Sequence, residues 1–150
     1  MGRKKNNDRF AMVDGRSDGA YTLLTDKMVR SKAYNSLSDS AARLLMVLKL
    51  KRQYFIGRDK QTGKEKAIDG NILNFTFSRE IQKMYGYNNP NKVRRCMIEL
   101  VENGFIDIVS NGWNTRTKTI YRYSSEWEKL DCGQEIELSR PAQTFINGRL

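Results

Sequence analysis

Polar capping residues and glycines divide the middle of the chain into short elements. Phe75 and Phe77 alternate with polar neighbours, and this spacing of two is typical of a half-buried strand. Ser78 has the side chain of a helix N-cap, and Gly86 can end a helix over residues 79–85. The middle of the chain is therefore predicted to begin with a strand, a short helix and a glycine-containing turn.

The residues that follow predict a second helix and a hairpin. Asn89 can cap the helix, and Pro90 stands at its first position, where the missing N–H costs nothing. Gly104 can adopt the left-handed conformation that ends it, and strands are expected over 105–109 and 120–123. Strand, helix, tight turn, helix and hairpin is the order of a winged helix-turn-helix. We therefore expect an α+β fold with a helical core and a small antiparallel β-hairpin wing. The helix positions expected in the core are Val93, Met97, Leu100 and Val101.

Helices are also expected before this series. Thr25 can cap a short helical turn, and another covers residues 32–36. Ser38 is the expected cap of the longest helix, which runs to about Arg52 and has apolar residues on nearly all sides. A helix of this kind is covered from several directions, so we expect it at the centre of the fold.

We expect one domain with two flanking segments. Residues 1–9 are polar and basic and are interpreted as an arm, residues 10–130 as the winged-helix domain, and residues 131–150 as a C-terminal tail with little pattern. Within the domain, the polar residues 53–71 are expected to form either a hairpin beginning at Tyr54 or a loop.

Composition excludes much catalytic chemistry. The chain has 150 residues, no histidine and two cysteines. Histidine-dependent nucleophilic catalysis and a tetrahedral zinc site therefore cannot be assembled. We interpret Cys96 as a small buried residue and Cys132 as a tail thiol. Because the acidic residues are scattered, a metal-dependent nuclease is the remaining and least favoured enzyme class. We expect no catalytic activity, no cofactor and no small-molecule substrate.

The net charge indicates the class of partner. The chain has 27 Lys and Arg against 17 Asp and Glu, which gives a formal charge of +10. A field of this sign attracts polyanions, and nucleic acid is the favoured one. No apolar run approaches the roughly 20 residues that span a bilayer, and no secretory signal is recognised at the start. We therefore expect a cytoplasmic protein without a membrane partner.

Four segments, and the motif Leu-x-x-x-Gly-Phe-Ile that begins at Leu100, carry a resemblance to known proteins. The segments are 39–48, 77–86, 93–106 and 120–124. They resemble winged-helix proteins of phages, plasmids and conjugative elements, and the chain is similar to the N-terminal domain of plasmid replication initiators. The resemblance implies sequence-specific binding of double-stranded DNA, either as a transcriptional regulator or at the repeats of a replication origin.

The exposed face of the second helix is the main functional feature. At 100° per residue, the face opposite the core stripe is polar or basic in its N-terminal half and acidic in its C-terminal half. The helix dipole favours the reverse order, with acidic residues at the N-terminus and basic residues at the C-terminus, and each favourable charge stabilises a helix by about 0.3–1 kcal/mol. Phosphates favour a helix N-terminus, Arg95 could bind guanine and Asn91 could bind adenine. The alternative is an ordinary solvated charged face.

The candidate DNA-binding residues come from four parts of the chain. They are Asn89, Asn91, Lys92, Arg94 and Arg95 on the second helix, Arg79 and Lys83 on the first, Arg116 and Lys118 in the wing, and Arg3, Lys4 and Lys5 in the arm. Two other functions fit the same scaffold, namely RNA binding and protein interaction. RNA readers usually expose aromatic residues on a sheet, whereas here the aromatics occupy core-like positions. The sequence permits a homodimer but marks no interface.

Overall fold

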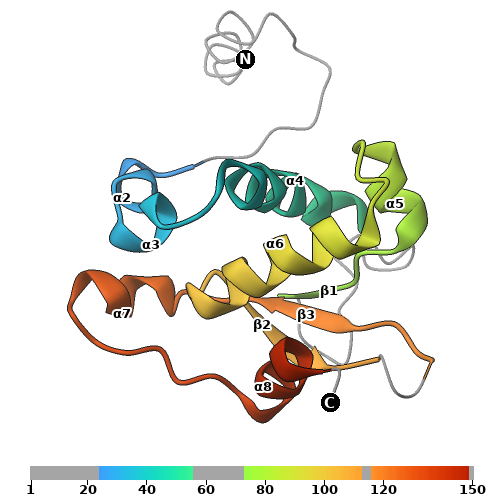
Figure 1. The fold of residues 1–150 in the computed structure, drawn as a ribbon. Coiled ribbons are helices and arrows are strands. Elements are labelled where there is room, and N and C mark those ends of the chain that lie inside the picture. Colours follow the sequence, from blue (N-terminus) through green and yellow to red (C-terminus); the bar gives the residue numbers. More distant parts are fainter. Residues whose placement is uncertain (1–23, 56–72, 113–115, 149–150) are drawn as a thin grey trace, which may run out of the picture.

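The computed structural model describes residues 24–55, 73–112 and 116–148, and within these it is an α+β fold (Figure 1). A three-stranded antiparallel sheet has the order β1-β3-β2. The strands are β1 (Asn74–Phe75), β2 (Ile106–Ser110) and β3 (Ile120–Tyr123). The helices are α2 (Asp26–Val29), α3 (Lys32–Asn35), α4 (Asp39–Phe55), α5 (Arg79–Met84), α6 (Pro90–Glu102), α7 (Trp127–Asp131) and α8 (Arg140–Asn147). None of the helices in the described ranges is long and apolar enough to cross a bilayer.

Helix α4 buries one face in the core, but the expectation that it is covered on nearly all sides is wrong, because Met46 is 39% exposed. The Ser38 hydroxyl accepts a hydrogen bond from the amide N–H of Ala41 at 3.2 Å, so Ser38 is the N-cap. The predicted cap of α2 is confirmed in the same way, with Thr25 accepting from the amide of Met28. The structure adds Ser31 as the cap of α3, where it accepts from the amide of Tyr34. Among residues 39–50 of α4, the buried ones are Ala41, Leu44, Leu45, Val47 and Leu48.

The predicted start of the following segment is wrong. Helix α4 continues through Phe55, so Tyr54 is helical and does not begin a strand. The rest of the expected hairpin or loop lies outside the described residues.

Helices α5 and α6 are joined by a tight turn whose chemistry was predicted from local sequence. Gly86 has a φ of 83°, and the Asn89 side chain accepts hydrogen bonds from the amides of Asn91 and Lys92 at 3.0 and 3.4 Å. Pro90 is the first residue of α6. Both features confirm the predicted helix boundaries.

The end of α6 is fixed by Gly104. Its φ of 79° lies in the left-handed region, and the amide of Phe105 donates to the carbonyl of Leu100 at 3.0 Å, as in a Schellman motif. A Cβ atom on Gly104 would lie 2.5 Å from the backbone nitrogen of Trp127. The glycine therefore permits both the helix stop and the close approach of α7.

The sheet is attached to the helices through aromatic side chains. Phe75 is fully buried and stacks on Tyr121 and Tyr123, with ring centroids 5.4 and 4.4 Å apart. The Tyr123 hydroxyl donates to the carbonyl of Leu48 on α4. Figure 1 shows α6 between α4 and the sheet, and the hairpin β2–β3 extending toward the same end of the molecule as the N-terminus of α6.

Residues 131–150 are not simply a tail. Helix α8 packs against β2 and α6 and buries Ala142 and Phe145 in the common core. Ser139 caps it by accepting a hydrogen bond from the amide of Ala142 at 3.2 Å. The domain boundary expected at residue 130 is therefore corrected, because the fold includes α8.

Candidate functional site

The N-terminal half of α6 exposes three polar or basic side chains. Asn91, Lys92 and Arg95 are exposed, whereas Val93 and Met97 on the opposite face are buried. Within the described part of the chain, no ion pair involves Lys92 or Arg95. The two cations are therefore directed to solvent from the helix end that also favours anions.

Two other candidate residues on α6 are engaged inside the protein. The oxygen of the Asn89 side chain accepts the amide hydrogen bonds that begin the helix. The half-buried Arg94 donates to the backbone carbonyl of Phe145 on α8. Its guanidinium carbon lies 5.2 Å from the centroid of the Phe145 ring. Burial raises the pKa of the neighbouring Tyr121 to about 12, although the charge of Arg94 opposes the rise. Arg94 thus lies on the side of α6 that α8 covers.

One of the two carboxylates in the acidic half of α6, that of Glu99, has a structural cause. One carboxylate oxygen of Glu99 accepts from the amide of Ser38 at 3.0 Å, and the other accepts from the Ser38 hydroxyl at 2.7 Å. Glu99 therefore binds the N-terminus of α4, where a negative charge is favourable. Its position does not require DNA as an explanation, so the order of charges along α6 supports an interface less strongly than the sequence pattern suggested.

The two candidates on α5 differ in their surroundings. Lys83 is exposed. Arg79 is partly buried and donates to the carbonyl groups of Tyr87 and Asn88 in the turn before α6, at 3.3 and 2.9 Å. Arg43 on α4, which the sequence analysis did not single out, donates to the carbonyl of Tyr85 at 3.0 Å. No short-range sequence signal identifies either contact, because each joins residues from different elements.

The described part of the β2–β3 loop also exposes two basic residues. Arg116 and Lys118 are exposed, and Arg116 has a φ of 54°. A Cβ atom on Gly112 would lie 2.0 Å from the carbonyl oxygen of Thr117, so a glycine permits the close return of the chain. The arm residues Arg3, Lys4 and Lys5 lie outside the described residues.

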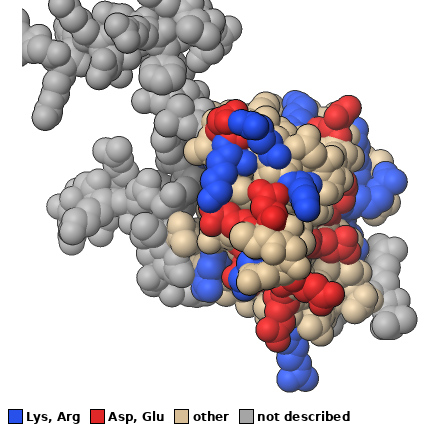
Figure 2. All heavy atoms as spheres, turned by 90° about the vertical axis from the view of Figure 1, so that its left-hand side faces the viewer, with Lys and Arg blue, Asp and Glu red and all other residues tan. Residues whose placement is uncertain are grey.

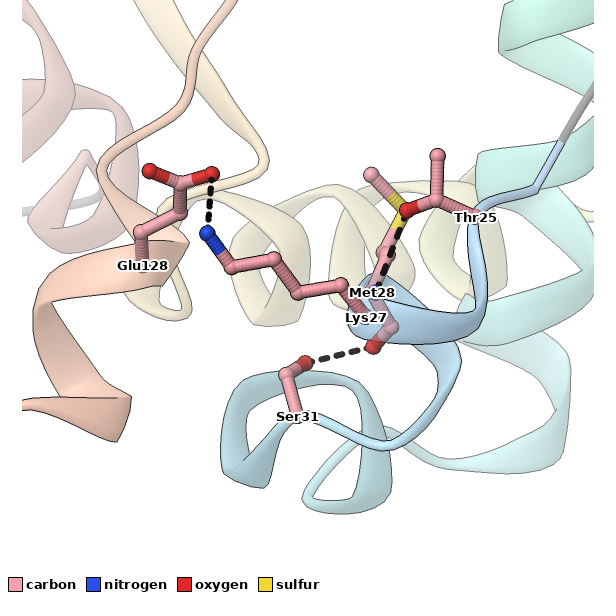
Figure 3. A network of polar contacts seen from close by, with 5 residues as sticks. All are labelled: Thr25, Lys27, Met28, Ser31 and Glu128. Atoms are coloured by element: carbon pink, nitrogen blue, oxygen red, sulfur yellow. Dashed lines mark hydrogen bonds and ion pairs between the residues drawn. The ribbon is translucent and has the colours of Figure 1, made fainter.

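The opposite end of the molecule has a different charge distribution. Figure 2 faces the end formed by α2, α3 and α7, where acidic and basic side chains alternate. Among the described residues three ion pairs occur there, and Lys27 of α2 reaches Glu128 of α7 at 3.3 Å (Figure 3). The other two pairs are Arg30–Asp26 and Lys129–Glu126. The cations of this end are therefore largely neutralised by neighbours, unlike those at the start of α6.

Three further features of the described residues bear on chemistry. No group of three or more His, Cys, Asp or Glu side chains in these ranges could hold a metal ion. A cavity of about 590 Å³ lies between the sheet and the segment that joins α7 to α8. Its charged lining residues are balanced in sign, namely Asp107, Glu126 and Glu137 against Arg122, Lys129 and Arg140. Cys96 is buried as predicted, and this burial raises the pKa of its thiol.

Comparison of the chain with protein-family models, with curated proteins and with solved structures gave no significant match.

Proposed function

We propose that the chain is a winged-helix protein that binds double-stranded DNA through the N-terminal half of α6. The element order α4, β1, α5, α6, β2, β3 and the strand order β1-β3-β2 support this assignment. In it, α6 is the recognition helix and the hairpin β2–β3 is the wing. The protein acts as a cytoplasmic transcriptional regulator or replication-initiation protein of a mobile element, with no catalytic step.

One observation carries the proposal. Asn91, Lys92 and Arg95 project from the first turns of α6 without a carboxylate partner among the described residues. The phosphate backbone is attracted by the cations and by the helix N-terminus, while Arg95 can form a bidentate pair with guanine and Asn91 with adenine. The net charge of +10 favours encounter with any polyanion, and α6 provides the part that can read bases.

The proposal is tested by selection from a randomised duplex pool at fixed salt, followed by affinity measurements on the enriched sequence. We expect an enriched motif and a dissociation constant on the order of 10⁻⁸ M or lower for that duplex. The same sequence as single-stranded DNA, and as duplex RNA, should bind at least about a hundredfold more weakly. Equal retention of RNA would favour an RNA-binding module, and the absence of any enriched motif would contradict specific recognition.

The wing is expected to contact phosphates. Replacing Arg116 and Lys118 together by alanine should reduce the slope of log K against log salt concentration by about 0.9 for each phosphate that the wing no longer neutralises. The measurement is a series of binding titrations between low and physiological salt. A double alanine variant at Lys27 and Arg30 removes the same charge from the opposite end and should leave the slope nearly unchanged. Equal slopes for the wing variant and the wild type would remove the wing from the interface.

A further inference from the structure

The turn between α5 and α6 is held by an arginine of α5. One guanidinium nitrogen of Arg79 donates to the side-chain oxygen of Gln82 at 2.8 Å and to the carbonyl of Tyr87 at 3.3 Å, and the other donates to the carbonyl of Asn88 at 2.9 Å. The Gln82 amide group in turn donates to the carbonyl of Phe77 at 2.8 Å. The last two residues before the cap Asn89 are therefore fixed to α5.

A second arginine reaches the same turn from α4. Arg43 donates to the carbonyl of Tyr85 at 3.0 Å, and its guanidinium carbon lies 4.9 Å from the centroid of the Tyr87 ring. Tyr87 is only 5% exposed, and its ring packs edge-on against Phe77. Two arginine side chains from different helices thus contact the turn. Together they donate to three of its carbonyl groups, and one of them packs on its buried ring.

These contacts suit arginine and not lysine. The carbonyl groups at the end of a helix and in the following turn lack partners within the helix. The planar guanidinium of Arg79 has donors in a fixed fork and binds two carbonyl groups at once. That of Arg43 binds one carbonyl group and lies over the Tyr87 ring, and an ammonium group on a flexible stem cannot reproduce either geometry. Because the turn leads directly into the first turn of α6, its position sets where that helix begins and how it is directed.

We propose that Arg79 and Arg43 are positioning residues that fix the α5–α6 turn and thereby determine the base selectivity of α6. The claim about base selectivity rests on the proposed function. Arg79, which the sequence suggested as a phosphate contact, acts through the backbone of the turn instead. The two roles differ in one measurable respect, because a phosphate contact tolerates exchange of arginine for lysine much better than a fork between two carbonyl groups does.

The test uses Arg79→Lys and Arg43→Lys, which keep the charge, with Lys83→Arg on the exposed surface of α5 as the matched control. Hydrogen exchange of the amides of residues 87–89, 91 and 92 should become at least about fivefold faster in both test variants, because a charge-assisted hydrogen bond is removed. Exchange in α7 and in the control should not change. Unaltered exchange at the turn in both test variants would overturn the proposal without any reference to DNA.

Binding provides the second readout. Arg79→Lys should lower the ratio of affinities for the selected and a random duplex about tenfold, the value of roughly one good base contact, while the salt slope stays the same. Faster amide exchange at the turn with an unchanged ratio of the two affinities would overturn the link to base selectivity. If amide exchange at the turn becomes faster but the wild-type protein binds no duplex, the result would support the role of the arginines in holding the turn and would contradict the proposed function. The two failures are therefore distinguishable.

Discussion

Replacing Arg95 by alanine should weaken binding to the selected duplex by about 1–3 kcal/mol, which is about 5- to 150-fold in Kd. Arg95 is exposed on α6, and no ion pair of the described residues involves it. Under the proposed function the substitution removes a base contact, and because the side chain is exposed it leaves no buried group without a partner. The free energy of unfolding should change by no more than about 0.5 kcal/mol. The measurement is a pair of titrations, one with the selected duplex and one with duplexes altered at single positions.

The pattern of the loss separates two roles of Arg95. A base-reading arginine loses discrimination at one position of the site, whereas a phosphate-binding arginine loses affinity equally on every duplex. Arg30→Ala is the matched control, because Arg30 is an exposed arginine that directly follows α2 at the far end of the molecule. An equal loss on random and selected DNA would contradict base reading by Arg95.

Replacing Phe75 by alanine should lower the free energy of unfolding by about 3–5 kcal/mol. Phe75 is fully buried and is stacked on two tyrosine rings of β3. Its removal leaves a cavity beside these two rings, at the strand pairing that connects the hairpin to β1. Denaturant unfolding of the two proteins provides the comparison.

A matched variant tests whether burial is the cause. Met84 is 73% exposed, so Met84→Ala should change the free energy of unfolding by about 0.5 kcal/mol or less. A loss below about 1 kcal/mol for Phe75→Ala would mean that this ring is not part of the core.

Local signals account for the features that the sequence predicted well. The Ser38 and Asn89 caps, the proline at the start of α6 and the stop at Gly104 each involve residues within a few positions of one another. The strand β3 was predicted at its observed bounds because residues of types common in strands, one isoleucine and two tyrosines, follow a turn signal. The α+β class followed from the order of these elements.

Contacts between distant residues account for what the sequence did not reveal. Glu99 binds Ser38, 61 residues away, and Arg94 binds the backbone of Phe145, 51 residues away. A helical projection shows which face a side chain occupies but not which other element covers that face. For this reason the projection treated Glu99 as part of a solvent-facing charge pattern, and it gave no sign that α8 engages Arg94.

The ends of elements were the other source of error. Helix α8 is only eight residues long, and its apolar positions give too short a pattern to be distinguished from a tail. Its burial of Ala142 and Phe145 depends on β2 and α6, which supply the surface that it covers. The extension of α4 to Phe55 similarly passes the point at which local polarity suggested an end.

The account depends on the first turns of α6 entering a duplex groove, and amide chemical-shift mapping tests this most directly. Isotope-labelled protein would be titrated with the selected duplex, and shifts would be followed residue by residue. The account predicts the largest changes at residues 91–95 and at 116–118, with little change in α2, α3 and α7. The largest changes at the α2–α3–α7 end, or no change at duplex excess, would contradict it.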